Sequence, residues 1–299
     1  MIAVDPVRPQ PEIIARAASV LRAGGLVAFP TETVYGLGAD ALNPRAVAGI
    51  FAAKGRPANN PLIVHVADAD QARGLTASWP DQAETLAARF WPGALTLVLP
   101  RGAAVPDVVV ASGPTVAVRC PAHPVAAALI RAAGTPVAAP SANRASELSP
   151  TTAGHVVKAL DGRIDLILDG GPTPGGLEST VLDLTSSPPR LLRPGLVPVG
   201  EIEAAIGPVG RPPAPDAVEL ARGPLPSPGT LPRHYAPRTP LFCFESPGEA
   251  VGAALDFLSR GLRVGWVGFE VPDALRRPEV LAARMPENVR DYTARLYET

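Results

Sequence analysis

The sequence predicts an α/β protein in which a mixed sheet is flanked by helices. Short apolar runs alternate with segments of helical spacing over the first 206 residues, and this alternation is the main observation behind the prediction. A second observation is the pair Asn43-Pro44, an N-cap residue followed by proline at the first helical position. The third is that polar segments adjoin most of the apolar runs, since loops at strand ends are where an α/β domain binds its ligand.

The expected elements follow one another along this domain. Residues 12–25 have helical apolar spacing and end in glycine, so we expect a helix there and a buried strand at 26–29. The next helix is expected to begin at Arg45. Further strands are expected at 62–66, 95–99, 115–119, 136–139, 166–169 and 179–184, with helices centred near Leu86, Ala127 and Val156 between them.

A proline-rich segment divides the chain. Residues 207–240 lack a sustained apolar period, which predicts an extended linker. We therefore expect a catalytic domain over 1–206, a linker or lid over 207–240 and a small α/β domain over 241–299. In the last of these the pattern predicts a strand at 241–245, a helix, a strand at 263–269 and a final helix from about Asn288. Because the chain ends inside a helical pattern, we expect this domain to be incomplete as given.

Bulk properties exclude several classes of protein. The net charge of −1 gives no general attraction to nucleic acid or to an anionic membrane. The N-terminus has no signal-peptide pattern, and no stretch approaches the roughly 20 apolar residues that span a bilayer, so we expect a cytoplasmic protein without membrane contact. Cys120 and Cys243 lie far apart and without CxxC spacing, which excludes a zinc site made of cysteines.

The familiar catalytic motifs are missing from the sequence. Gly36 to Ala41 match GxGxxA, but no helix opens there and no acid occurs at 54–66, so we favour a glycine turn over a dinucleotide site. No P-loop, GxSxG or HExxH motif occurs, and the four histidines do not cluster.

What the sequence does contain is a set of polar clusters at strand ends. They comprise PTETVYG at 30–36, KGRPANNPL at 54–62, Arg119, the segment 140–151 with Ser141, Asn143 and Ser149, Ser179, and Arg193. Each alone is typical of a solvated turn or helix cap. Together they share cations, hydroxyls and amides, which favour anion binding and predict phosphoryl or nucleotidyl transfer.

Three residues within or near these clusters have two interpretations. His65 is either a satisfied core histidine or a residue that lines the same pocket. His234 and Tyr235 belong either to an exposed linker or to a segment folded over the site.

Lys54 is one of only two lysines in the chain, against 25 arginines. We therefore hypothesise that a phosphate requires a compact ammonium at this position.

Seven motifs together resemble a known family. They are PTETVYGLGADA, KGRPANNPLIVHV, TVAVRCP, APSANRASELSPT, LESTVLDL, LLRPG and LPRHYAP. In this order and spacing, over about residues 10–237, they resemble the threonylcarbamoyl-AMP synthases of the YrdC-like superfamily, in the longer two-domain form. The resemblance implies a YrdC-like twisted mixed sheet with flanking helices, a linker and a small Rossmann-like C-terminal domain.

The resemblance also implies roles for individual residues. The implied catalytic set is Lys54, Arg56, Ser141 and Asn143. The implied threonine-binding positions are Thr33, His65, Arg119, Ala139 and Ser179, and the implied ATP-binding positions are Arg56, Asn60, Thr115, Ser141, Ser149, Arg193, His234 and Tyr235. This chain differs from the family motif SANxSG: residues 141–147 read SANRASE, so that Ser146 is followed by Glu147 and not by glycine.

The implied reaction condenses L-threonine, bicarbonate and ATP to L-threonylcarbamoyladenylate and pyrophosphate. The implied cofactor is Mg²⁺ carried in by ATP, without a metal site of the protein's own. The product is expected to pass to proteins that transfer the threonylcarbamoyl group to tRNA, while direct binding of tRNA stays open. Two other classes are weighed: an RNA-binding module, and a carbamoyl-nucleotide enzyme with another acceptor, whose acylphosphatase and zinc-finger patterns do not occur here.

Overall fold

The computed structural model describes residues 1–211 and 239–297 of the chain. Clustering of contacts divides the chain into two units, Met1–Ala236 and Pro237–Thr299, and each is described by itself. His234 and Tyr235 lie outside the described residues, as does most of the predicted linker, so the boundaries 207–240 stay a prediction.

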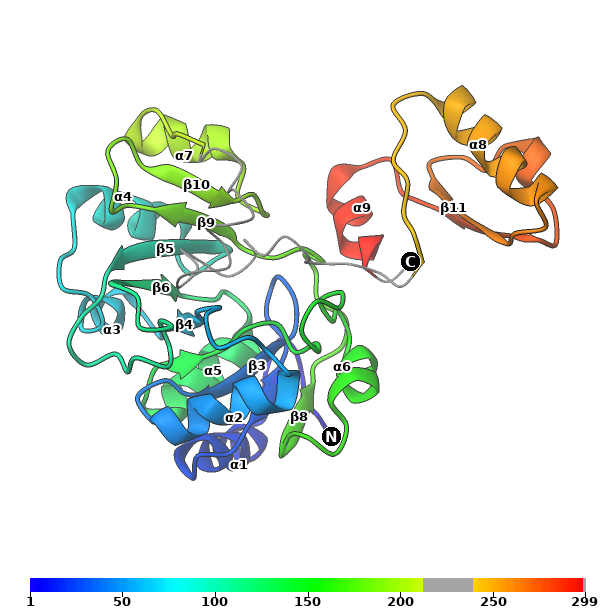
Figure 1. The fold of residues 1–299 in the computed structure, drawn as a ribbon. Helices are drawn as coiled ribbons and strands as arrows, with labels where there is room; N and C mark the ends of the chain where they lie inside the picture. Colours follow the sequence, from blue (N-terminus) through cyan, green and yellow to red (C-terminus); the bar gives the residue numbers. More distant parts are fainter. Residues whose placement is uncertain (212–238, 298–299) are drawn as a thin grey trace. The chain divides into compact units, whose positions relative to one another are not determined.

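The first unit is built on one ten-stranded sheet (Figure 1). Its strands are β1 (Ile2–Ala3), β2 (Val27–Phe29), β3 (Gly36–Asp40), β4 (Ile63–His65), β5 (Leu95–Pro100), β6 (Thr115–Arg119), β7 (Val137–Ala138), β8 (Leu166–Asp169), β9 (Thr180–Asp183) and β10 (Arg190–Arg193). They lie in the order β1-β8-β2-β3-β7-β4-β6-β5-β9-β10. The sheet contains both parallel pairs, such as β4 with β6, and antiparallel pairs, such as β5 with β6, so the predicted mixed α/β sheet is confirmed.

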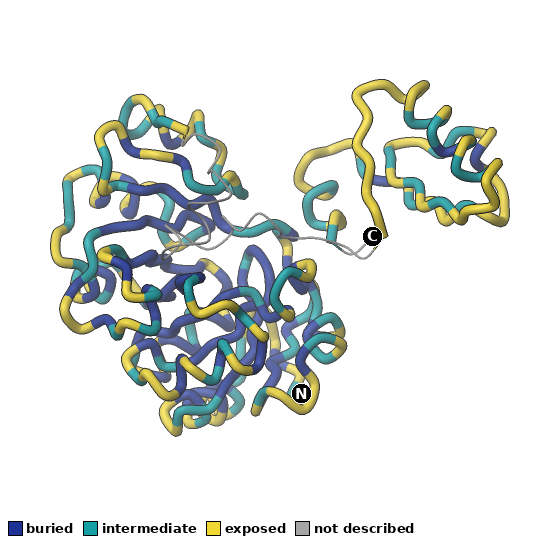
Figure 2. Tube along the Cα trace, viewed as in Figure 1, coloured by how far each residue is buried: buried dark blue, intermediate teal, exposed yellow. Residues whose placement is uncertain are grey.

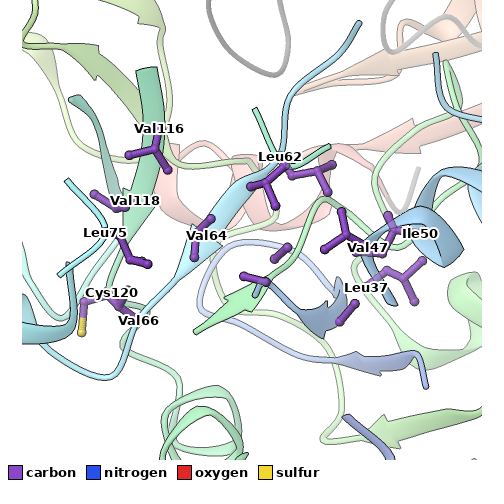
Figure 3. Packing of buried hydrophobic residues seen from close by; sticks show 14 of the residues in the cluster. Leu37, Val47, Ile50, Leu62, Val64, Val66, Leu75, Val116, Val118 and Cys120 are labelled. Atoms are coloured by element: carbon purple, nitrogen blue, oxygen red, sulfur yellow. The ribbon is translucent and has the colours of Figure 1, made fainter. Parts of the chain in front are cut away.

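Helices cover both faces of this sheet. They are α1 (Pro11–Arg22), α2 (Pro44–Lys54), α3 (Ala69–Arg73), α4 (Asp81–Phe90), α5 (Pro124–Ala133), α6 (Ala153–Leu160) and α7 (Val199–Ile206). Side chains of α1 and α5 pack together over β2, β7 and β8. The other five helices contribute to the larger core on the opposite face, where Val47 and Ile50 of α2 lie near Leu37 of β3 (Figure 3).

The alternation of side chains along β4 and β6 leaves part of one sheet face for a site. Val64 and Val118 point into the larger core, so their neighbours in sequence, such as His65 and Arg119, point to the opposite face. The α1 and α5 side chains pack on that face over β2, β7 and β8, and a small apolar cluster around Ile63 covers it further along. Polar side chains can therefore lie on buried strands beside α5. The buried strands form the dark centre of this unit in Figure 2.

The GxGxxA segment is a strand, not the glycine turn that we predicted. Residues 36–40 form β3, which pairs with β2 and β7. A Cβ atom on Gly38 would lie 2.7 Å from Cε1 of Phe29 and 2.9 Å from Cγ1 of Val137, both of which belong to the core under α1 and α5. The glycine thus makes room for neighbouring side chains, a reason for glycine that a sequence motif does not reveal.

Helix α2 begins and ends as its sequence indicates. The Oδ1 of Asn43 accepts hydrogen bonds from the backbone N–H groups of Arg45 and Ala46, and Pro44 occupies the first turn. Gly55 ends the helix with φ +61, a left-handed conformation that favours glycine. Helix α2 therefore ends with Lys54, directly before the loop that leads to β4.

The second unit contains α8 (Pro247–Ser259), β11 (Val264–Gly268), a short 3₁₀ helix (Asp273–Leu275), β12 (Val280–Arg284) and α9 (Val289–Leu296). The final helix is confirmed, since Asn288 caps α9 through Asp291. The predicted strand at 241–245 is wrong. Strand β11 pairs instead with β12, in parallel, while Phe242 packs against Phe257 of α8 at 5.4 Å between ring centroids. No helix of the described residues is both long and apolar enough to span a bilayer.

Candidate active site

The polar clusters predicted from the sequence converge on one cavity. It is lined by Thr31, Thr33, Val34, Tyr35, Gly36, Arg56, Ile63, His65, Arg119, Ala139, Pro140, Ser141, Glu178, Ser179 and Arg193. Among the predicted residues, those that line it are Thr33, Arg56, His65, Arg119, Ala139, Ser141, Ser179 and Arg193. Lys54, Asn60, Thr115, Asn143 and Ser149 lie outside the lining, and His234 and Tyr235 fall outside the described residues.

A larger cavity, of about 470 Å³, lies between α4 and α5 and contains none of the predicted residues. Three of its polar groups already have partners: Asp68 caps α3, Glu84 forms an ion pair with Arg73, and the Cys120 thiol donates to the Ala67 carbonyl. Its size alone does not make it a site, and we place the candidate site in the polar cavity.

Arg119 lies at the end of β6 and faces the cavity. Its side chain is only 4 % exposed and forms an ion pair with Glu32, with 2.6 Å between Nη2 and Oε1. Its Nε donates to the Gly93 carbonyl at 3.2 Å. Nη1 has no hydrogen-bond partner among residues 1–211 and 239–297. The Nε–Nη2 edge of this guanidinium is therefore occupied, while the Nη1–Nη2 end can accept a carboxylate.

His65 is the register neighbour of Arg119 across the parallel pair β4–β6. Burial, and next the charge of Arg119, lower the pKa of His65 to about 3, so the imidazole is neutral at physiological pH. Its Nδ1 is buried and has no hydrogen-bond partner among the described residues. His65 is thus buried as a core histidine would be, but it lines the cavity with an unsatisfied ring nitrogen. Of the two interpretations, the geometry favours the pocket.

Thr33 presents a hydroxyl acceptor to the same cavity. The Thr31 hydroxyl donates its single proton to the Val34 carbonyl at 2.7 Å. The Thr33 hydroxyl, 2.8 Å from it, must therefore donate to Thr31. The oxygen of Thr33 keeps lone pairs for a donor such as an ammonium or a hydroxyl.

Ser179 is held from behind by Thr96 and Arg193. The hydroxyls of Thr96 and Ser179 lie 2.7 Å apart, and both residues are buried. Arg193 donates to the Ser179 carbonyl through Nε and Nη2, and Nη2 also lies 3.1 Å from the Ser179 hydroxyl. This network orients Ser179, which directly precedes β9 and lines the cavity.

Lys54 supports the site from beneath and does not line it. Its Nζ donates to the carbonyls of Ser141 and Asn143 at 2.6 and 2.5 Å, and it lies 3.4 Å from the Asn143 Oδ1. Burial, followed by the charge of Arg56, lowers the pKa of this amine. An ammonium has three donors, and three oxygens here account for all of them. Lys54 thus ties the end of α2 to the loop that begins at Ser141.

The loop at 141–149 is further fixed by its own hydrogen bonds. The Nδ2 of Asn143 donates to the carbonyls of Arg144 and Glu147, and its Oδ1 accepts from the Ser141 hydroxyl at 2.5 Å. Ser146 has φ +70, the left-handed region that favours glycine. The conformation that the family's glycine would suit therefore occurs at Ser146, one position before the Glu147 at which we located the departure.

Arg56 lines the cavity, and Asn60 holds the guanidinium of Arg56 in place. The guanidinium of Arg56 donates to the Asn60 carbonyl, the Asn60 Oδ1 and the Pro61 carbonyl at 3.1, 2.6 and 2.7 Å. Ser149 has a similar supporting place, since its hydroxyl donates to Glu178 at 2.5 Å and Glu178 lines the cavity. Thr115 lies at the other end of β6 from Arg119, about 13 Å along the strand by the usual rise per residue.

Comparison with family models identifies the family of this chain. The model described as "Telomere recombination", of the Sua5/YciO/YrdC family, matches residues 19–195, and the model described as "Threonylcarbamoyl-AMP synthase, C-terminal domain" matches residues 197–299. The chain belongs to the Sua5/YciO/YrdC family.

Relatives and solved structures of this family cover most of the chain. It is 49 % identical to the threonylcarbamoyl-AMP synthase of Pyrococcus abyssi over 265 residues, which covers 86 % of this chain and 77 % of the relative. It is 51 % identical to that of Bacillus subtilis over 261 residues, 84 % and 72 % of the two chains. The crystal structure of P. abyssi Sua5 complexed with L-threonine matches with a TM-score of 0.90 at 43 % identity, covering 100 % of this chain and 87 % of that chain.

Several residues of this Sua5-like site were not assigned roles from the sequence. They are Thr31, Glu32, Thr96 and Glu178. For Thr96 the available signal is a lone hydroxyl inside the apolar run LTLVL. Glu32 was visible as the carboxylate of PTETVYG, but its partner lies 87 residues away, on another strand.

Proposed function

We infer that this chain is an L-threonylcarbamoyladenylate synthase, which makes threonylcarbamoyl-AMP and pyrophosphate from L-threonine, bicarbonate and ATP. Its family and its relatives of about 50 % identity support this activity. The observation in the structure that carries the proposal is a single cavity with Arg56, Arg119 and Arg193 in its lining beside one carboxylate, Glu178. Such a lining suits a substrate set that bears several negative charges.

One end of the cavity fits L-threonine. Arg119 would hold the carboxylate through its Nη1–Nη2 end. Thr33 would accept a hydrogen bond, and so would the Ala139 carbonyl, because the Ala139 N–H already donates to Ile63. Ser179 and the neutral His65 complete this end. Buried polar groups that pair only with the threonine hydroxyl would discriminate against analogues that lack it.

The other end fits the phosphates of ATP. Arg56, Ser141 and Arg193 line the cavity and would contact the nucleotide. Lys54, Asn60, Asn143 and Ser149 would act from behind, by holding those groups or the loop that carries them. Direct ATP contacts for Thr115, His234 and Tyr235 stay predictions.

The reaction needs two bond-forming steps. The amine of threonine attacks the carbon of bicarbonate, forms a C–N bond and releases water, which leaves a carbamate. A carbamate oxygen then attacks the α-phosphorus of ATP, and the bond to the bridging oxygen breaks to release pyrophosphate. Arg56 would offset charge that develops on the departing phosphates, while a site shielded from water would limit loss of CO₂ from the carbamate.

Magnesium fits this site as part of the ATP substrate. No group of three or more His, Cys, Asp or Glu residues that could hold a metal occurs among the described residues, and Glu178 is the carboxylate in the cavity lining. The phosphate oxygens of ATP would supply most of the ligands, and Glu178 is the side chain that could add one. The ion would neutralise phosphate charge when bound.

The product would supply the threonylcarbamoyl group for threonylcarbamoyladenosine in tRNA. It is an acyl-adenylate mixed anhydride, so its consumer must be a transferase that places the acyl group on the tRNA nucleoside. A cavity with three guanidiniums suits a single nucleotide better than an RNA duplex, which favours the synthase over an RNA-binding module.

The test is pyrophosphate release from ATP, with L-threonine and bicarbonate each omitted in turn. We expect release only in the presence of both, together with a nucleotide product that contains threonine. Release that is indifferent to threonine would contradict the proposal and favour a carbamoyl-nucleotide enzyme with another acceptor. Failure to bind ATP, with binding of an RNA hairpin instead, would favour the RNA-binding class.

A further inference from the structure

Glu32 is a partly buried acid that does not itself line the cavity. Its side chain is 17 % exposed, and its neighbours Thr31 and Thr33 are lining residues while Glu32 is not. Its two oxygens accept from different elements: Oε1 from Nη2 of Arg119 at 2.6 Å, and Oε2 from the backbone N–H of Ala122 at 3.1 Å. Glu32 therefore links the PTETVYG loop to β6 and to the turn before α5.

The contacts of Glu32 decide which edge of Arg119 is free. A guanidinium has a side edge, Nε with Nη2, and an end, Nη1 with Nη2. Glu32 and the Gly93 carbonyl occupy the side edge. The end keeps both Nη1 hydrogens and one of Nη2, a pair of parallel donors that matches a carboxylate. Without Glu32, the Gly93 carbonyl alone would hold the guanidinium.

Electrostatics favours the same arrangement. Burial would raise the pKa of Glu32, but the charge and hydrogen bond of Arg119, together with backbone N–H groups, lower it overall. The acid is therefore ionised at neutral pH and compensates a guanidinium that is 4 % exposed. A compensated cation can remain aimed into an empty cavity without its carboxylate ligand.

We propose that Glu32 is a positioning residue for threonine recognition, which holds the side edge of Arg119 so that its end faces the substrate carboxylate. This proposal rests on the proposed function. It predicts a selective effect on threonine, because Glu32 touches neither the Arg56 nor the Ser141 part of the cavity. A merely structural tie would instead lower kcat and the affinity for ATP together with the affinity for threonine.

The experiment measures steady-state pyrophosphate release in the full chain for Glu32→Gln and Glu32→Asp, with threonine and ATP each varied. The carboxylate of Glu32 accepts from two N–H donors, one at each oxygen, whereas the side-chain amide of Gln has one acceptor oxygen. Glu32→Gln therefore loses one hydrogen bond along with the charge. We expect KM for threonine to rise about tenfold, the equivalent of losing one charge-assisted hydrogen bond, with kcat and KM for ATP within about twofold of wild type. Glu32→Asp keeps the charge and should recover part of the loss.

The matched control is Glu84→Gln, which removes the charge of another glutamate that pairs with an arginine, Arg73, outside the polar cavity. Its KM for threonine should equal that of wild type. An unchanged KM in Glu32→Gln would overturn the proposal. A parallel fall in kcat and in ATP affinity would also overturn it in favour of a structural tie. If wild-type release does not depend on threonine, the proposed function fails instead, which is a separate result.

Discussion

Two buried cations support the two ends of the cavity, and they do so differently. Arg119, at the threonine end, lies on a strand, pairs with an acid and keeps one end of its guanidinium open. Lys54, at the nucleotide end, lies at the terminus of a helix and points its ammonium at three oxygens of the 141–147 loop. Both side chains are nearly inaccessible, at 4 % and 2 %.

The difference follows from the geometry of the two cations. A planar guanidinium cannot direct all its donors to one point, so an edge remains for a ligand when the other is held. A compact ammonium can direct three donors at converging carbonyls and then has none left. Our hypothesis that a phosphate requires the ammonium of Lys54 is therefore replaced by a structural reason for lysine: the loop carbonyls require it.

The largest effect should come from Lys54→Met, which keeps the length of the side chain but removes its donors. The carbonyls of Ser141 and Asn143 would be left buried without this partner, at a cost of about 3 kcal/mol in the free energy of unfolding. Turnover should fall at least about 100-fold as the loop shifts. Urea unfolding and pyrophosphate release measure the two effects.

Lys158→Met is the control, because Lys158 is the other lysine of the chain and is exposed. It should change neither quantity. Lys54→Arg should not restore turnover, since a guanidinium does not match three converging acceptors. Wild-type stability in Lys54→Met with a raised KM for ATP alone would show that Lys54 contacts phosphate after all.

The next largest effect is expected for Arg119→Lys at the other end. The ammonium of a lysine cannot donate to Glu32 and at the same time form two parallel hydrogen bonds to the threonine carboxylate. We expect KM for threonine to rise about 100-fold, equivalent to about 2.7 kcal/mol, while KM for ATP changes little. Varying each substrate in turn measures this split, and an equal loss for both substrates would contradict the division of the cavity into two ends.

A smaller effect is expected from Thr96→Val, which removes the hydroxyl 2.7 Å from Ser179. The substitution keeps the shape of the side chain, so the fold should persist. Loss of one neutral hydrogen bond is worth about 1 kcal/mol, which predicts a rise of about fivefold in the Kd for threonine. Isothermal titration with threonine would test it, and unchanged affinity would show that Arg193 alone suffices to orient Ser179.

The smallest effect concerns pH. The pKa of Glu32 is lowered in the folded chain, so its pairing with Arg119 stabilises the fold above the ordinary carboxyl pKa of 4.5. That contribution is lost as the pH falls below 4.5 and through the folded pKa. The difference in unfolding free energy between wild type and Glu32→Gln should therefore be present at pH 7 and shrink toward pH 4. A difference that stays constant over this range would contradict ionic pairing.

Much of the site could be predicted because its residues are local in the sequence. PTETVYG, KGRPANNPL and the segment from Ser141 each adjoin β2, β3, β4 or β7, and in these antiparallel pairs the end of one strand lies beside the start of its neighbour. What lies behind the lining could not be predicted in this way. The partners of Glu32 and Lys54 lie 87 to 90 residues away, and nothing local in the sequence specifies such pairs.

The two wrong fold predictions have the same origin. Glycine at 38 is required by Phe29 and Val137 of neighbouring strands, not by a turn. The apolar run at 241–245 has the composition of a strand, but strand β11 pairs with β12. Local composition reports what a segment can form, whereas a strand also depends on a partner elsewhere in the chain.

By itself the sequence determined the class of fold, many of the helices and strands of the first unit, the ends of α2 and the identity of the polar residues, because periodicity, capping and motif spacing are local properties of the chain. Only the tertiary structure decided which of these residues line the cavity and which support it. That distinction depends on the direction of each side chain and on distant partners, as with Arg119 facing the cavity while Lys54 lies beneath it.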